Sequence, residues 1–203
     1  MFSEIKKSVA SGLLITIGGC VYLTCNEYGL GWFGSILFSA GLFTICEYQF
    51  NLYTGKVGYI ACNFKDTRYI LLVLRILLVN LLTSFLMGIL VGRYFPVVSG
   101  AAKKIYEAKL NCSLVKSFIS AVFCGILMYL AVDTWKRGKK IGVFIYIPVF
   151  IMCGFDHSIA NSFYNGAALG EHTFTLANAA LTTVVILGNA AGGMIFHLLI
   201  KER

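Results

Sequence analysis

The sequence predicts an all-α integral membrane protein with six transmembrane helices. Of its 203 residues, 58% are hydrophobic and only 13% are charged, and the mean hydropathy is +0.80. Apolar stretches of about 20 residues, the length a helix needs to cross a bilayer, recur along the whole chain. Too little polar sequence remains for a catalytic or nucleotide-binding domain outside the membrane. The composition therefore excludes a soluble domain, and we expect no enzyme.

Six apolar segments are separated by charged residues, and two of the six are interrupted. The second is too long for one helix and is interrupted by the polar stretch 47–51, and the fifth is interrupted at 154–158. Polar groups inside a span are costly and usually face a protein interior or a water-filled path, so both interruptions predict such a path. The expected segments are 8–25, 30–62, 69–95, 114–134, 141–165 and 174–200.

The two interrupted segments are the middle members of two successive triplets. Thr54, just after the first interruption, and His157, within the second, lie 103 positions apart, about half the chain. Because three is odd, two halves of three spans each insert with opposite orientation. This arrangement predicts an inverted repeat within one channel domain, residues 1–203, with halves of approximately 1–100 and 101–203. Discontinuous helices of such repeats meet near the bilayer midplane and form a transport site there.

Basic residues predict the orientation. The formal net charge is +8, with 17 Lys and Arg. Because most of them lie between apolar segments, we interpret the charge as topological and expect no nucleic-acid partner. With the N-terminus inside, Arg75 and Lys56 fall within spans, and the excess predicts a multi-pass protein of the inner (plasma) membrane with both termini cytoplasmic. The ten inner residues are Lys6, Lys7, Lys65, Arg68, Lys136, Arg137, Lys139, Lys140, Lys201 and Arg203, and the five outer ones are Arg93, Lys103, Lys104, Lys109 and Lys116.

Neither the cysteines nor the histidines form a recognisable cofactor pattern. The seven cysteines include no CxxC pair and mostly lie inside apolar runs, where a thiol packs as a small hydrophobe. The three histidines, His157, His172 and His197, show no pairing of the kind that a membrane haem needs. The GxGxxG match at 29–34 opens a membrane span instead of following a strand. We therefore expect no cofactor and no metal.

Three motifs resemble those of the formate/nitrite transporter family. The run Gly154–Asn161, G-F-D-H-S-I-A-N, is very similar to the family's fifth-helix signature G-F-E-H-S-I-A-N. The run Asn51–Gly55, N-L-Y-T-G, resembles the second-helix break (E/D)-L-F-T-G, and Glu107–Leu110 resembles the family's E-A-K segment. The resemblance covers all six spans. It implies an aquaporin-like six-helix fold built from an inverted repeat, a homo-pentamer, and one pore in each protomer.

The same resemblance implies a set of pore residues. His157 corresponds to the central pore histidine, Thr54 to its hydrogen-bonding partner, and Lys109 to the lysine that makes the pore region electropositive. Asn51 and Asn161 belong to the two break motifs, although Asn51 stands where the family usually has a carboxylate. The apolar constrictions map to residues that the sequence does not divide between inner and outer constrictions, and ordinary core packing is the alternative for them. These are Phe38, Leu42, Leu52, Tyr53, Met128 and Phe150.

The expected function is passage of a small monovalent weak-acid anion: formate, nitrite or hydrosulfide. Moving an isolated charge through a dry apolar constriction is expensive, so neutralising the anion first removes most of the cost. Lys109 stabilises negative charge near the pore, and His157 supplies a hydrogen bond or a proton. The sequence leaves open a passive channel or a proton-coupled transporter. The alternatives are a neutral-solute pore of the urea or water type and, more distantly, a membrane-anchor subunit of a redox enzyme.

Overall fold

The computed structural model describes residues 2–200, and every regular element within that range is helical. The α-helices are α1 (Phe2–Glu27), α2 (Gly31–Glu47), α3 (Tyr53–Lys56), α4 (Thr67–Tyr94), α5 (Pro96–Leu110), α6 (Leu114–Lys136), α7 (Ile141–Met152), α8 (Ser158–Ala167) and α9 (Leu176–Ile200). Two 3-10 helices accompany them, η1 (Val57–Cys62) and η2 (Glu171–Phe174).

Within the described residues, four helices are long and apolar enough to cross a membrane: α1, α4, α6 and α9. The apolar helices α2 and α7 are shorter, with 17 and 12 residues, and each is followed by a break and a second helical piece. The predicted helical membrane fold is therefore confirmed, and both interruptions lie where the polar stretches indicate. Lys201 and Arg203, used to predict the orientation, lie outside the described residues.

Helix α5 occupies a stretch that the sequence reading left as a connection between spans. Pro96 stands at its first position, where a fixed φ suits a helix start and the missing N–H has no intrahelical partner to lose. Val98, Ala101, Ala102 and Tyr106 then form one buried face at helical spacing. Because only these few side chains are buried, hydropathy alone does not distinguish the helix from a loop.

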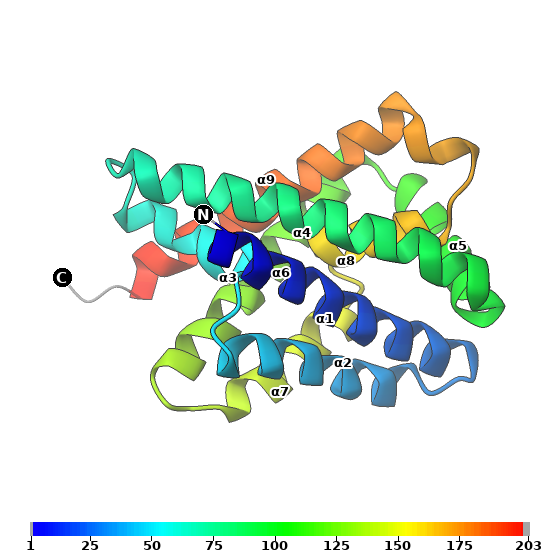
Figure 1. The fold of residues 1–203 in the computed structure, drawn as a ribbon, viewed down its shortest axis with the longest axis horizontal. Helices are drawn as coiled ribbons and strands as arrows, with labels where there is room; N and C mark the ends of the chain where they lie inside the picture. Colours follow the sequence, from blue (N-terminus) through cyan, green and yellow to red (C-terminus); the bar gives the residue numbers. More distant parts are fainter. Residues whose placement is uncertain (1, 201–203) are drawn as a thin grey trace.

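Close helix packing holds the bundle together. Figure 1 shows α1 with α2 on one side and α4 on the other, and α4 packs along α8 while α6 packs along α9. A Cβ atom at Gly88 of α4 would clash with the Phe163 carbonyl of α8, and one at Gly166 of α8 would clash with the Phe85 carbonyl of α4. Small residues at these crossings let the two backbones approach, as in other membrane bundles.

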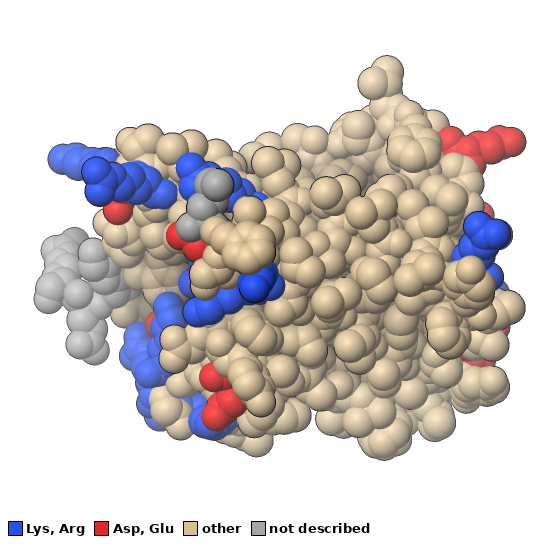
Figure 2. Space-filling view, viewed as in Figure 1, with Lys and Arg blue, Asp and Glu red and all other residues tan. Residues whose placement is uncertain are grey.

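Charge is concentrated at the ends of the molecule. Figure 2 shows Lys and Arg gathered at the end where α1 begins and α9 ends, a smaller charged group at the opposite end, and a broad uncharged surface between them. Many large apolar side chains on that surface are exposed, including Leu78, Leu82 and Leu86 on α4. An apolar belt between two charged ends is the surface expected of a protein in a bilayer.

Candidate functional site

The two helix breaks bring Thr54 and His157 together in the buried centre of the bundle. Leu52 and His157 both adopt extended backbone, with φ/ψ of −108°/130° and −103°/116°, immediately before α3 and α8. The Thr54 Oγ1 atom lies 2.9 Å from His157 Nε2, and both residues are at most 2% exposed. The predicted contact between the two halves of the chain is therefore present in the structure.

Helix capping defines which nitrogen of His157 carries the proton. The backbone N–H of Ala160 donates to His157 Nδ1 at 3.1 Å, so the side chain caps the start of α8. A nitrogen that accepts a hydrogen bond carries no proton, so the proton of the neutral ring lies on Nε2. Nε2–H then donates to Thr54 Oγ1, and the Thr54 hydroxyl proton remains free to point elsewhere.

Asn80 of α4 holds the first break in place. Its Oδ1 accepts from the backbone N–H of Tyr53 at 2.9 Å, and its Nδ2 donates to the Asn51 carbonyl at 3.1 Å and to the Ser8 carbonyl at 2.8 Å. Backbone groups freed by a break inside a membrane must find partners, because lipid offers none. One fully buried amide thus pairs groups on both sides of the break and ties them to α1.

Asn189 of α9 does the same at the second break. Its Oδ1 accepts from the backbone N–H of Ser158 at 2.9 Å, and its Nδ2 donates to the Asp156 carbonyl at 2.8 Å and to the Ala121 carbonyl at 2.9 Å. The two asparagines occupy matching places in α4 and α9, and each pairs the same three kinds of backbone group. We call them the Asn80 clamp and the Asn189 clamp.

A buried charge cluster lies beside the second break. Asp156 is 5% exposed, and its Oδ1 lies 2.6 Å from Nζ of Lys109, at the end of α5. Oδ1 also accepts from Asn161 Nδ2 at 2.8 Å, and Oδ2 accepts from the Ser120 hydroxyl at 2.8 Å. Charged groups in such places require complete hydrogen bonding, and the Asp156 carboxylate has it. The Lys109 charge is therefore anchored beside His157 and is not free to move with solvent.

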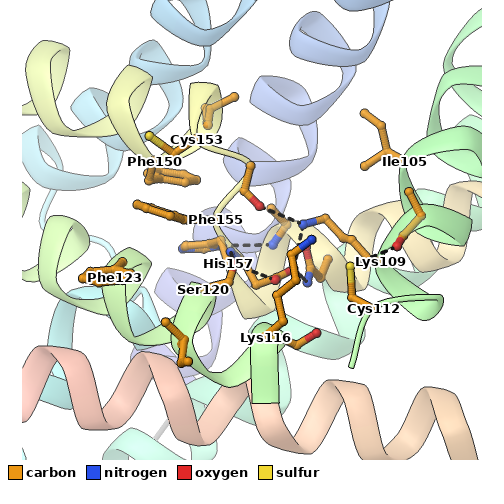
Figure 3. A pocket seen from close by; sticks show the side chains of 18 of the residues that line it. Ile105, Lys109, Cys112, Lys116, Ser120, Phe123, Phe150, Cys153, Phe155 and His157 are labelled. Atoms are coloured by element: carbon orange, nitrogen blue, oxygen red, sulfur yellow. Dashed lines mark hydrogen bonds and ion pairs between the residues drawn. The ribbon is translucent and has the colours of Figure 1, made fainter. Parts of the chain in front are cut away.

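A cavity of about 720 Å³, the α5 vestibule, leads to this cluster. Lys109, Lys116, Asn161, His157 and Phe150 all contribute to its wall. Figure 3 shows Lys109 and Lys116 entering from one side of the cavity, with the rings of Phe150, Phe155 and His157 facing them from the other. The Asp156 carboxylate, which also lines the cavity, matches the Lys109 charge, so Lys116 contributes the further positive charge there.

A second cavity of about 420 Å³, the α3 vestibule, lies toward the other end of the bundle. Ser113, just before α6, lines the α5 vestibule, whereas Lys136, at the end of α6, lines the α3 vestibule. A helix of 23 residues spans about 35 Å, so the two cavities open at opposite ends of the molecule. The predicted site therefore lies between two separate entrances.

The structure sorts the predicted constriction residues by vestibule. Phe150 lines the α5 vestibule and stacks on the His157 ring with centroids 5.7 Å apart, while Leu42 and Leu52 line the α3 vestibule. Phe38 lies edge-on to Phe150, with centroids 6.3 Å apart. The buried residues Phe38, Tyr53 and Met128 line neither vestibule.

Asn51 has a position different from that of the other predicted polar residues. Its Nδ2 donates to the Glu4 carbonyl at 3.4 Å, and it lines neither vestibule. The sequence reading did not select Asn80, Asn189, Ser120 or Asp156 as site residues. An asparagine within an apolar run was the available sign for the two clamps: the segment 69–95 contains Asn80, and the segment 174–200 contains Asn178 and Asn189.

Among residues 2–200, no three His, Cys, Asp or Glu side chains lie close enough to hold a metal ion. The seven cysteines are all free thiols. Thr54 pairs with His157, and Asp156 pairs with Lys109, Ser120 and Asn161, whereas the buried Ser158 hydroxyl has no hydrogen-bond partner among the described residues.

Comparison with known proteins identifies the family. The family model described as formate/nitrite transporter matches residues 3–201. The chain belongs to the formate/nitrite transporter family. It is 29% identical over 198 residues to a probable formate transporter of Methanothermobacter thermautotrophicus, a match that covers 81% of this chain and 71% of that protein.

Two other known proteins are similar to this chain over less of their length or at lower identity. The uncharacterized transporter YrhG of Bacillus subtilis (strain 168) is 33% identical over 100 residues, 45% of this chain and 37% of YrhG, so the chain matches little more than a third of that protein. The solved structure titled "Pentameric formate channel with formate bound" superimposes with a TM-score of 0.78 at 23% identity and covers 98% of this chain and 94% of that one. The fold is therefore that of a formate/nitrite transporter.

Proposed function

We propose that this member of the family is a passive channel or proton-coupled transporter for a small monovalent weak-acid anion: formate, nitrite or hydrosulfide. The observation that carries the proposal is the Thr54–His157 hydrogen bond, which joins two helix breaks between two lysine-lined vestibules. The names of the relatives support formate as one substrate. The apolar side chains of Phe150, Leu42 and Leu52 serve as constrictions on the two sides of the bond.

Each group at the centre has a defined part in passage. Lys109, anchored by Asp156, stabilises an anion in the α5 vestibule by its field. Closer to the constriction, the anion leaves water, and hydrogen bonds from His157 Nε2–H and the Thr54 hydroxyl offset part of the lost hydration. The Thr54 hydroxyl proton is already free for the anion, whereas His157 Nε2–H leaves Thr54 Oγ1 to reach it. Protonation of the weak acid removes the remaining charge before the apolar stretch.

The resting geometry favours His157 as a hydrogen-bond donor over a carrier of positive charge. A proton on Nδ1 would displace the Ala160 N–H bond that caps α8. Protonation of His157 therefore costs a helix cap, about 1 kcal/mol in other helices. Proton coupling, where it occurs, draws its proton from the vestibule water or proceeds with transient loss of this cap.

The topology proposed is six transmembrane segments in two inverted halves. The Asn80 and Asn189 clamps support it, because each fixes the break of the second segment of its half to the first and third. We further propose a homo-pentamer with one pore per protomer, placed in the lipid bilayer of the inner membrane with both termini cytoplasmic. The α3 vestibule then faces the cytoplasm and the α5 vestibule faces outward. The chain is a transport protein without enzymatic activity or cofactor.

Proteoliposomes test the proposal directly. We expect purified protein to take up formate, nitrite or hydrosulfide at a rate that depends on pH, while urea enters no faster than in empty vesicles. Urea or water flux independent of pH would instead support a neutral-solute pore, and a haem absorbance band in the purified protein would support a redox anchor. Native mass spectrometry in mild detergent tests the pentamer, and a stable monomer or trimer would contradict it.

A further inference from the structure

An arginine lies well inside α4, on the outer surface of the bundle and away from the proposed pore. Arg75 follows Thr67, the first residue of the helix, by eight positions, which places it about 12 Å along the helix axis. Its side chain is exposed, as are those of Leu71 and Leu78, one helical turn to either side. A charged side chain among lipid-facing leucines is costly unless it reaches the membrane interface or meets an anion.

A second arginine lies on the same side of α4. Arg68 and Arg75 both line a cavity of about 450 Å³, which we call the α4 groove. Seven residues correspond to almost two full turns, so the two side chains start from one face of the helix. The exposed Leu71, Leu78 and Leu82 lie along that face at spacings of three, four and seven from Arg75. Figure 1 shows α4 along the outside of the bundle, and its apolar stretch has the smallest buried share among the four long helices.

Two carboxylates line the same groove, at the end of the molecule where α4 begins. They belong to Glu4, in the first turn of α1, and to Asp66, the residue just before α4. The backbone N–H of Arg68 donates to Asp66 Oδ1 at 3.0 Å, which holds this carboxylate at the helix start. Among residues 2–200, neither carboxylate lies within 4.0 Å of the guanidinium group of Arg68 or Arg75. The groove therefore contains two positive and two negative side chains that form no ion pairs with one another.

The order of these groups along α4 matches the order of groups in a phospholipid with an amine headgroup. Leucines occupy the deepest part of the face, where acyl chains lie. The guanidinium groups of Arg68 and Arg75 come next, and guanidinium binds phosphate oxygens through paired hydrogen bonds. A long arginine side chain also extends toward the membrane interface, where the phosphate lies. Asp66 and Glu4 lie at the outer end, where the ammonium group of such a headgroup extends beyond its phosphate.

We propose that the α4 groove binds a phospholipid whose headgroup joins a phosphodiester to a primary ammonium group, as in phosphatidylethanolamine. Arg68 and Arg75 hold the phosphate, and Asp66 and Glu4 hold the ammonium group. An anionic headgroup such as phosphatidylglycerol leaves the two carboxylates without a cation. The trimethylammonium group of phosphatidylcholine has no N–H to donate to them. The groove lies outside both vestibules, so its occupancy does not depend on which anion the pore carries.

Native mass spectrometry of the purified protein, with added lipids of identical acyl chains, tests the proposal. We expect phosphatidylethanolamine to bind the parent protein roughly fivefold more tightly than phosphatidylcholine or phosphatidylglycerol, since one charge at a membrane surface contributes about that factor. Arg75→Gln should weaken phosphatidylethanolamine binding roughly fivefold. Arg93→Gln is the matched control, because Arg93 is exposed at the other end of α4 and does not line the groove. Equal binding of the three lipids by the parent, or equal losses in the two variants, would overturn the proposal.

Asp66→Asn tests the ammonium end of the groove and preserves the helix start, because asparagine caps a helix as well as aspartate does. We expect this variant to bind phosphatidylethanolamine only as tightly as phosphatidylcholine, with phosphatidylcholine binding unchanged. Thermal unfolding of the same samples should show the parent's stability. An undiminished preference for phosphatidylethanolamine in this variant would overturn the proposed headgroup.

Two further measurements separate a lipid from other occupants. Soluble glycerophosphoethanolamine carries the same headgroup without acyl chains, so at equal concentration it should not displace the lipid. Displacement would show that the headgroup alone is bound and would overturn the lipid assignment. Loss of oligomer mass in Arg75→Gln with unchanged lipid binding would show that the groove contacts a second copy of the chain, which would also overturn the proposal.

Discussion

The break between α2 and α3 and the break between α7 and α8 are held by equivalent asparagines but surrounded by different charges. Asn80 and Asn189 each pair one backbone N–H and two carbonyls. Beside the second break, Asp156 forms an ion pair with Lys109. Beside the first, the neutral side chain of Asn51 donates to the Glu4 carbonyl.

The difference shows that the hydrogen bonding of the backbone at a break and the charges beside that break are separate requirements in this fold. A break needs partners for its freed amide groups, and a neutral asparagine provides them at both places. The charge beside a break is independent of how the backbone groups of the break are hydrogen-bonded. At the second break a lysine is fixed by a carboxylate, and at the first Lys56 is left without one within 4.0 Å among the described residues.

The largest effect is expected from removing a clamp. Asn80→Leu and Asn189→Leu each leave three buried backbone groups without a partner, and each such group costs roughly 1–3 kcal/mol. We expect both variants to lose on the order of 4 kcal/mol or fail to assemble, as measured by thermal unfolding in detergent. Asn111→Leu, on the exposed end of α5, should change little. A loss in only one of the two variants would contradict the equivalence of the clamps.

The next effect concerns the charge that distinguishes the breaks. Asp156→Ala should destabilise the protein by about 3 kcal/mol, because breaking a buried pair leaves the Lys109 charge uncompensated. The double variant with Lys109→Ala should lose less than the sum of the single changes. Lys104→Ala, in the exposed pair with Glu27, is the control and should cost under about 1 kcal/mol. Additive losses would show that the Lys109–Asp156 pair does not act as a unit.

A smaller free-energy change, but a large change in flux, is expected at the junction of the breaks. His157→Phe removes the donor at Nε2 and should lower anion flux on the order of a hundredfold, about 2.7 kcal/mol in the barrier. His157→Asn keeps a donor and should preserve assembly while changing how flux depends on pH. Thermal stability measured beside uptake separates a transport role from a structural one. If both variants lose stability together and keep flux per folded protomer, His157 is structural.

The smallest effect is expected from a charge at the rim of the α5 vestibule. Lys116 is exposed and lines this cavity, so Lys116→Gln should slow anion entry about twofold at low ionic strength. The difference should disappear in high salt, where exposed charges are screened. A salt-independent loss in the Lys116 variant would mean that the residue acts through structure.

Much of the fold was predictable because hydropathy and interrupted spans depend on local sequence. The family prediction is confirmed, and the resemblance in the two break motifs identified Thr54 and His157 as partners. The roles of the predicted pore residues stay predictions. Helix α5 was not predicted because its buried face is small. The two clamps were not predicted because an asparagine in an apolar run does not reveal which backbone groups its side chain reaches.

The sequence by itself determined that the chain is a helical membrane protein. It also determined where the spans are interrupted and by which polar residues, because polar residues are rare inside a membrane span and are therefore easy to recognise there. Only the tertiary structure decided how those residues are paired. The Lys109–Asp156 pair joins residues 47 positions apart, and the Asn80–Ser8 bond joins residues 72 apart. Such contacts depend on how the helices cross, which no local pattern specifies. The structure also decided which lysine is matched by an acid, Lys109, and that Lys56 has no acid within 4.0 Å among residues 2–200.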